Sequence, residues 1–355
     1  MRLWNSSEAA FLKLTALLLV VCLLPVFAFA EDSGTDDDPW VKFILVCNEG
    51  MQNTGANVGN TMMVVALNTD TGIIRLMMMT WDTFVEYEGY DMPQKIDMAY
   101  RNNGPEETMK VFNQNFGMDI DLFMSLNYSN LASMIDNYGG VTIDVSRAER
   151  NALNGMVASK KDSIQAQADA GTASQLLIEL LAQEYTLEDF GPETHLNGLQ
   201  AVGYGWLQYD SVYNCCLREG KVVSNLFASV AAKIGDQVVF YTNESGAPDN
   251  LNGKRAINVD DITDEDMAFL REEISPIFQM SYNNLTEDDI AAITRALVLC
   301  AYRASRQGVD IFSAVETGIF PQEALKPYDT VAGTEGHLVD YEANAEAMRA
   351  FLYQE

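Results

Sequence analysis

The sequence is poor in basic residues, in histidine and in cysteine. Its 355 residues include 22 Lys and Arg against 51 Asp and Glu, which gives a formal net charge of -29. Because this charge repels phosphate backbones, we expect no binding to nucleic acid. Five cysteines in a chain of this length exclude a disulfide-rich scaffold. Since 48% of the residues are hydrophobic, the chain can nevertheless bury a large core.

Long hydrophobic runs are absent beyond the N-terminal region. Two basic residues precede an apolar run over 14–30, and Ala28-Phe29-Ala30 is typical of a signal cleavage site. We therefore interpret residues 1–30 as an export signal, which predicts an extracytoplasmic protein. A retained anchor is the alternative, because the run is barely long enough to span a bilayer. The acidic residues 31–40 are expected to form a solvated tether.

Apolar runs and helical patterns then alternate along the chain, starting with a strand over 41–47. Residues 62–67 and 73–79 are expected to pair as a hairpin, because the cluster 68–72 between them is typical of a turn. Residues 147–193 are polar and are interpreted as an elaboration. Similar reasoning predicts further strands over 122–126 and 141–145 and helices over 105–117, 129–138, 173–183, 198–209, 218–233 and 293–301. This alternation predicts an α/β fold with helices packed on a central sheet.

Eight short motifs occur in an order that is found in one family of bacterial envelope proteins. They are Ile44-Leu45-Val46-Cys47-Asn48-Glu49, Asn60-Thr61-Met62-Met63, Thr80-Trp81-Asp82-Thr83, Lys95-Ile96-Asp97-Met98-Ala99-Tyr100, Asn103-Gly104-Pro105-Glu106, Tyr138-Gly139-Gly140-Val141, His195-Leu196-Asn197-Gly198-Leu199-Gln200-Ala201 and the closing segment 340–353. From about residue 41 to its end, the chain resembles the LytR-CpsA-Psr proteins.

The resemblance implies a three-layer α/β/α domain with a central mixed sheet. It would cover 41–355 as a single domain, with core motifs over 41–235 and a C-terminal elaboration over 236–355. It also implies a phosphotransferase-type ligase that transfers a glycopolymer from polyprenyl pyrophosphate to the cell wall. The expected partners are therefore a polyprenyl phosphate or pyrophosphate-linked glycan and peptidoglycan or another wall polymer, at the outer face of the cytoplasmic membrane.

Four cationic positions of the family pattern are occupied by other residues here. The segment Val58-Gly59-Asn60-Thr61 stands where the family reads Arg-x-Asp-Thr, and Trp81 replaces the arginine of Arg-Asp-Thr. Trp206 and Gln208 stand where the family has paired arginines. Because such arginines stabilise charge in the transition state, we expect catalysis to be weakened or lost. The alternative is a non-catalytic binder of polyprenyl-phosphate lipid or wall glycan.

The resemblance also indicates which polar residues would form the remaining site. Glu49 and Asn60 would hold Mg²⁺ together with waters and substrate phosphates. The catalytic candidates are Glu49, Asp82 and Arg218, and the substrate-binding candidates are Asn60, Trp81, Lys95, Trp206, Gln208 and Lys221. Two alternatives stay open. The cations could instead form ordinary ion pairs, and the two tryptophans could fill the pocket rather than stack on a ligand.

The resemblance places Cys47 and Cys215 near one cleft. A disulfide between them is one hypothesis, a zinc site that also uses Cys216 is a second, and three buried thiols are a third. The 17 methionines allow two interpretations as well: a flexible lipid pocket or ordinary core packing.

Overall fold

The computed structural model describes residues 38–48, 59–171, 186–208, 210–307, 311, 315–322 and 328–353. Residues from Trp40 onward form one unit. The elements, in chain order, are β1 (Trp40–Asn48), β2 (Gly59–Asn68), β3 (Ile74–Met79), β4 (Phe84–Val85), β5 (Gln94–Lys95), α2 (Asp97–Asn103), α3 (Pro105–Phe116), β6 (Leu122–Asn127), α4 (Tyr128–Asn137), β7 (Val141–Val145), α5 (Arg147–Asp169), β8 (Gly191–Leu196), α7 (Gly198–Gly205), α8 (Val212–Gln237), β9 (Val238–Tyr241), β10 (Arg255–Asn258), α9 (Asp264–Gln279), β11 (Tyr282–Asn283), α10 (Glu287–Gln307), β12 (Val315–Phe320), β13 (Tyr328–Val331), β14 (Thr334–His337) and α11 (Tyr341–Tyr353).

Six strands form the central sheet, in the order β11-β6-β1-β2-β3-β12. The β1-β2 and β2-β3 pairs are antiparallel, whereas β6 and β12 run parallel to their neighbours β1 and β3. The sheet is therefore mixed, as expected. The predicted hairpin joins β2 to β3, and the Asn68 side chain accepts hydrogen bonds from the backbone N–H groups of Asp70 and Thr71 in its turn.

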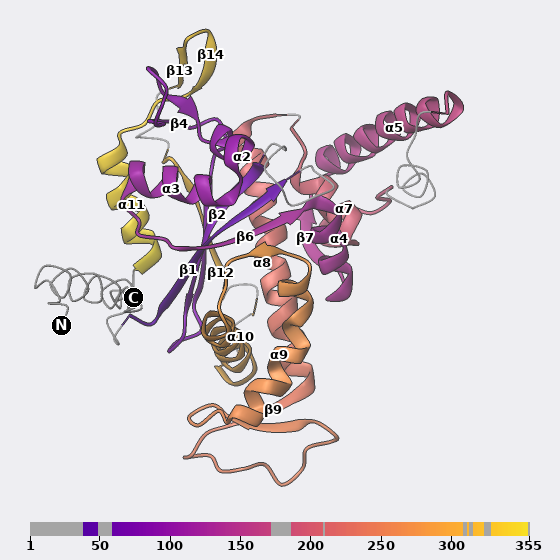
Figure 1. Cartoon of the computed structure of the whole chain (residues 1–355). Helices are drawn as coiled ribbons and strands as arrows, with labels where there is room; N and C mark the ends of the chain where they lie inside the picture. The colour runs from indigo at the N-terminus through magenta and orange to yellow at the C-terminus, as the bar shows by residue number, and fades with distance from the viewer. Residues whose placement is uncertain are drawn as a thin grey trace, which may run out of the picture. The chain divides into compact units, whose positions relative to one another are not determined.

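Helices cover both faces of the sheet, which confirms the α/β/α layers (Figure 1). Because side chains alternate along a strand, Phe43 and Leu45 of β1 join one buried cluster and Ile44 and Val46 join the other. Helices α4, α8 and α10 pack on the first face, and α2, α3 and α11 on the second. Strands buried on both faces explain the continuous apolar runs in the sequence.

Local signals set several helix ends. Gly117, in the left-handed conformation, closes α3 as expected. Asn127 caps α4, and a capping box of Ser146 and Glu149 begins α5. The 23-residue α5 occupies the part that the sequence suggested was a polar elaboration. Because α5 contains few apolar residues, hydrophobic periodicity does not reveal this helix in the sequence. The helix predicted over 173–183 lies outside the described residues.

The part of the chain after residue 236 completes the layers. Strands β11 and β12 are the two edges of the central sheet, and α10 and α11 pack on opposite faces of it. Strand β7, by contrast, pairs with β8 in a separate two-stranded sheet. In the part of the chain that the structure describes, every helix is too short or too polar to cross a bilayer.

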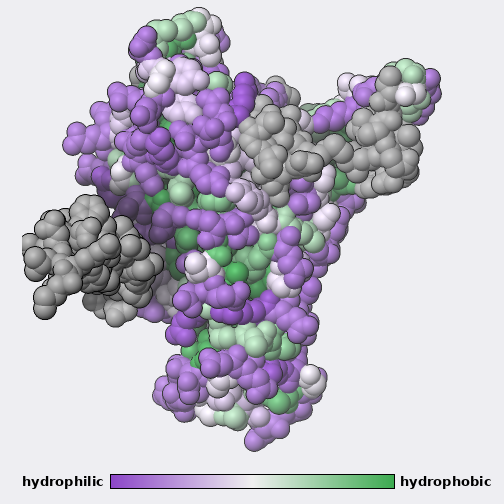
Figure 2. Space-filling view, in the orientation of Figure 1, coloured by the Kyte–Doolittle hydropathy of each residue, from purple (hydrophilic) through white to green (hydrophobic). Residues whose placement is uncertain are grey.

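The visible surface is largely hydrophilic, as the charge predicts (Figure 2). Most methionines of the strands are core residues: Met62, Met63 and Met77–Met79 are at most 1% exposed. Core packing is thus the better interpretation for these five.

Candidate functional site

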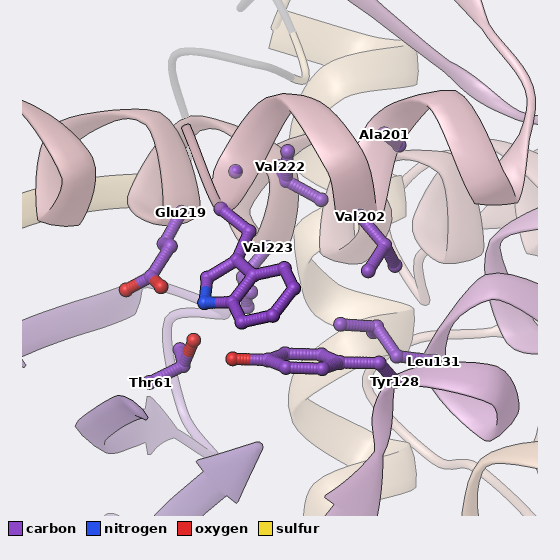
Figure 3. Close-up of a pocket in the computed structure, with 10 residues that line it drawn as sticks. Thr61, Tyr128, Leu131, Ala201, Val202, Glu219, Val222 and Val223 are labelled. Atoms are coloured by element: carbon purple, nitrogen blue, oxygen red, sulfur yellow. The ribbon is translucent and has the colours of Figure 1, made fainter. Parts of the chain in front are cut away.

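A small pocket lies between Thr61, near the start of β2, and the helices α4, α7 and α8 (Figure 3). Its volume of about 20 Å³ leaves room for little more than one water molecule. The residues that line it are Thr61, Tyr128, Leu131, Ala201, Val202, Gly205, Trp206, Glu219, Val222 and Val223. The walls are mostly apolar, and the polar groups of Thr61, Tyr128 and Glu219 point toward the same space in Figure 3.

The close packing of α7 against α4 builds one wall of this pocket. A Cβ at Gly198 would lie 1.9 Å from the carbonyl oxygen of Ala132, so only glycine fits there. Asn197 and Gln200 form a capping box that begins α7 at this contact. The family-like motif around Gly198 therefore has a structural role, because it sets the distance between α7 and α4.

Glu219 is the unexpected residue of the pocket. It is buried on α8, accepts a hydrogen bond from Thr61, and lies 3.9 Å from the Cys215 sulfur through Oε1. Burial raises the pKa of Glu219 to about 8, although the Thr61 hydrogen bond and the Arg218 charge act in the opposite direction. Its Oε2 has no hydrogen-bond partner among the described residues. At neutral pH this carboxyl group therefore carries a proton and can donate a hydrogen bond to a ligand.

Trp206 ends α7 and packs into the same pocket. Its ring centroid lies 5.5 Å from that of Tyr128, and Lys160 of α5 places its Nζ 3.9 Å from the indole centroid. The indole Nε1 has no hydrogen-bond partner in the described part of the chain. Trp206 lines the pocket and little volume remains beside its ring, an arrangement that favours a pocket-filling role over stacking on a ligand.

Arg218 is held by carboxylates rather than offered to a phosphate. Its guanidinium makes a bidentate contact with Asp210, at 3.0 Å from Nη1 and 2.8 Å from Nη2. Nη2 also donates to the backbone oxygen of Leu207, and Glu149 lies 3.9 Å from Nη1. The side chain of Arg218 is only 3% exposed. Hydrogen bonds from Arg218 lower the pKa of Asp210 to about 2, so the pair is ionic at any physiological pH.

A second group of predicted residues gathers beside β4 and β5. The Lys95 Nζ lies 5.2 Å from the Trp81 ring centroid, and buried Asp82 is 3.8 Å from His337 Nε2. Burial raises the pKa of the neighbouring Asp97, against the charges of Arg101 and Lys95. The structure thus brings Trp81, Asp82 and Lys95 together, in a group that shares no lining residue with the pocket.

The remaining candidates do not complete a site. Gln208 and Lys221 are exposed. Glu49 lies outside the described residues, and only the backbone of Asn60, in β2, is described. Within the described ranges no three His, Cys, Asp or Glu side chains gather as metal ligands, and the pocket's one acid, Glu219, is protonated at neutral pH. These residues alone do not fit Mg²⁺, so a magnesium site at Glu49 and Asn60 stays a prediction.

The disulfide hypothesis is corrected by the structure. Cys47, Cys215, Cys216 and Cys300 are all buried, and none of these four described cysteines forms a disulfide. Cys47 belongs to β1 and to the buried core cluster on one face of the sheet, and the Cys215 sulfur on α8 is 3.4 Å from the backbone oxygen of Gly205. Burial and the nearby Glu219 carboxyl raise the pKa of both Cys47 and Cys215, so neither thiol ionises readily. The zinc hypothesis also lacks support among the described residues, and buried thiols are what remains.

An apolar cavity adjoins the pocket. It shares Leu131 and Val223 with it, and every one of its lining residues is apolar. Its volume of about 30 Å³ is far too small for a lipid chain as it stands. The lining residues are Phe43, Leu45, Met124, Leu126, Leu131, Met134, Val223, Leu226, Phe227, Val230, Ile277, Phe278, Ile293 and Leu297. Four of them belong to α9 and α10, where Figure 2 shows apolar side chains reaching the surface.

Sequence reasoning missed Glu219, Thr61 and Asp210 as site residues. One signal was available: Glu219 follows Cys215 by four residues, and both fall on the stripe of α8 that continues with the apolar residues Val222, Val223 and Leu226. An acid on an apolar stripe indicates a buried carboxyl group. Nothing comparable marked Asp210 as the partner of Arg218.

Comparisons with known proteins agree with this fold. The LytR_cpsA_psr family model matches residues 34–213, just over half of the chain. The polyisoprenyl-teichoic acid–peptidoglycan teichoic acid transferase TagU of Halalkalibacterium halodurans is 26% identical over 111 residues, which are 31% of this chain and 36% of the relative. The match therefore spans about a third of that protein's length.

Two solved structures are similar over most of their length. TagV of B. subtilis has a TM-score of 0.56 at 13% identity, with 89% of this chain and 98% of that chain covered. TagT bound to LIIa-WTA has a TM-score of 0.53 at 13% identity, with 88% and 91% covered. At these identities the likeness shows a shared fold.

Proposed function

The chain belongs to the LytR-CpsA-Psr family, and from this premise we propose that it is a bacterial cell-envelope protein that binds a polyprenyl-linked glycopolymer, with transfer to the wall weakened or lost. The family relative TagU is a transferase of polyisoprenyl-linked teichoic acid to peptidoglycan, which supports this class of partner. The export signal proposed for residues 1–30 would place the protein outside the cytoplasm.

The apolar cavity supports the lipid part of the proposal. Residues from the sheet and from α4, α8, α9 and α10 line it, and the pocket with Glu219 and Thr61 adjoins it. An isoprenoid tail would lie in the cavity and the head group would face the polar groups of the pocket. Because the cavity holds only about 30 Å³, binding requires the helices that line it to move apart.

One observation carries the loss of transfer: the contacts of Arg218. This guanidinium is buried and neutralised by Asp210 and Glu149, and the described residues that line the pocket include no cation. A pyrophosphate in its transition state needs several positive groups, each worth roughly 2 to 4 kcal/mol in comparable sites. A pocket whose only ionisable acid is already protonated can bind a lipid phosphate weakly, yet it supplies little of that stabilisation.

Native mass spectrometry with polyprenyl phosphate tests the lipid part. Leu226→Phe fills the cavity from α8, and Leu217→Phe makes the same change at a 36% exposed position of the same helix. We expect an adduct of one lipid with the wild type and with Leu217→Phe, and a loss of the adduct in Leu226→Phe. A protein that stays free of lipid in all three cases would refute the proposal.

An active transferase is the second candidate function, because the Asp210 side chain is 26% exposed and a substrate phosphate would have access to it. In this case a pyrophosphate would replace Asp210 on Arg218. Incubation with a lipid-linked glycopolymer and peptidoglycan distinguishes the two. Wall-linked product that disappears in Arg218→Lys would establish a phosphotransferase-type ligase, and lipid binding without product would establish the binder.

A further inference from the structure

The loop between β4 and β5 carries an exposed aromatic surface that the pocket and the cavity do not use. Tyr90 is 46% exposed and Met92 is 48% exposed. The Tyr90 ring stacks on the buried Tyr87, with centroids 5.2 Å apart and planes 23° apart. Beside them is a hollow of about 470 Å³, lined by Glu86, Tyr87, Glu88, Gly89, Tyr90, Asp91, Met92, Pro93, Gln114 and Asn115. We call the stacked pair Tyr87 and Tyr90, together with this hollow, the tyrosine platform.

The platform is held in place before any ligand arrives. The Asn102 amide donates to the hydroxyl groups of both tyrosines, at 3.3 Å in each case. Asn115 and Glu86 exchange two hydrogen bonds of 2.8 Å, from Glu86 N to Asn115 Oδ1 and from Asn115 Nδ2 to Glu86 O. A fixed ring loses little conformational entropy on binding, which favours a binding role for an exposed aromatic side chain.

The chemistry of the platform matches a sugar ring. A pyranose has an apolar face of C–H groups and a rim of hydroxyl groups, so it fits a flat aromatic ring that is surrounded by carboxylates and amides. Glu86, Glu88 and Asp91 provide acceptors around the tyrosine ring, and Gln114 adds an amide. Single exposed tyrosines are common on protein surfaces, but a propped ring beside a polar hollow of this size is a different arrangement.

The charge of the rim selects among glycans. Three carboxylates and no cation are among the described residues that line the hollow, and Lys110 is paired with Glu88 at 3.1 Å. A phosphodiester or uronic acid polymer would be repelled, whereas a neutral chain would not. We propose that the tyrosine platform is a binding site for a neutral hexopyranose glycan. This inference does not depend on lipid binding in the cavity.

Calorimetric titration of the full chain with the tetrasaccharide of N-acetylglucosamine tests the proposal without any lipid. Tyr90→Ala removes the exposed ring, Tyr90→Phe keeps it, and Tyr282→Ala removes a similarly exposed ring (44%) outside the hollow. We expect saturable binding by the wild type. It should weaken roughly fivefold or more in Tyr90→Ala and change little in the other two variants, because the ring face supplies the contact.

Several outcomes would overturn the proposal: no saturable binding by the wild type at millimolar sugar, equal binding by wild type and Tyr90→Ala, or an equal loss in Tyr282→Ala. Tighter binding of a polyglycerol phosphate or of a lysine-rich peptide at Tyr90 would also overturn it, since the platform would then recognise charge. Thermal melting of each variant separates a lost contact from a lost fold. Polyprenyl phosphate adducts are measured separately, so the two proposals fail independently.

Discussion

The buried carboxyl group of Glu219 makes a quantitative prediction about stability and pH. Its pKa is about 8 in the folded chain, against an ordinary value of 4.5. Between these two values the folded chain keeps a proton that the unfolded chain releases. The free energy of unfolding therefore falls as pH rises from 4.5 toward 8. At about 1.4 kcal/mol for each unit of pH in this interval, this amounts to roughly 2 to 3 kcal/mol between about pH 5.5 and pH 7.5.

Glu219→Gln removes this pH dependence while it keeps the size of the side chain and an acceptor for the Thr61 hydroxyl group. Urea unfolding of wild type and variant at both pH values gives the difference, because all other titrating groups are shared. We expect the wild type to lose roughly 2 to 3 kcal/mol more than the variant. Cys215→Ser, in contact with the same carboxyl group, is the matched control and should keep the wild-type slope. Equal losses in wild type and Glu219→Gln would refute the buried, protonated state.

Three further predictions concern the pocket and its surroundings. Asp210→Asn should lower the free energy of unfolding by about 2 kcal/mol at neutral pH, because Arg218 loses a buried partner. That advantage of the wild type is present above pH 3.8 and should disappear as pH falls toward 2, which urea titrations in acid will show. Gly198→Ala should lower the melting temperature sharply, since its Cβ would meet the Ala132 carbonyl oxygen. Gly203→Ala on the same helix, whose nearest neighbour is a leucine methyl group at 3.0 Å, should be tolerated, so similar melting of both would contradict the packing argument. The four described cysteines should resist alkylation in the native protein and react fully in denaturant without reductant, and a disulfide-linked peptide in the digest would contradict this prediction.

The site has a plain consequence for the family mechanism. The pocket contains a protonated carboxyl group, Glu219, and an aromatic wall formed by Trp206 and Tyr128. Such a pocket suits a phosphate head group of low negative charge, because the described residues that line it include no cation to neutralise a larger one. Arg218, the one family-like arginine of the sequence pattern in this region, is neutralised by Asp210. The proposed loss of transfer therefore has two causes: the replacement of family arginines by other residues, and the ion pair by which Asp210 occupies Arg218.

Much of the fold follows from the sequence by itself. The continuous apolar runs over 41–47, 62–67 and 73–79 determined three central strands, because strands covered on both faces need apolar residues at every position. Gly117 and the turn after Asn68 determined where α3 and β2 end. The ordered motifs indicated the family, and the family model agrees.

The long α5 and the site were decided only by the tertiary structure. A polar helix such as α5 has no apolar periodicity that could be detected in the sequence. Its contacts with α7, which only the tertiary structure shows, help to hold it in place. The carboxylate partners of Arg218 lie on α5 and in the loop before α8, and Thr61, which donates to Glu219, lies on β2. The sequence spacing says nothing about which carboxyl group reaches which cation. The cysteines illustrate the same limit, since Glu219 lies near both Cys47 and Cys215, yet the two cysteines form no disulfide. Burial sets the charge state of such groups, and burial is a property of the assembled fold.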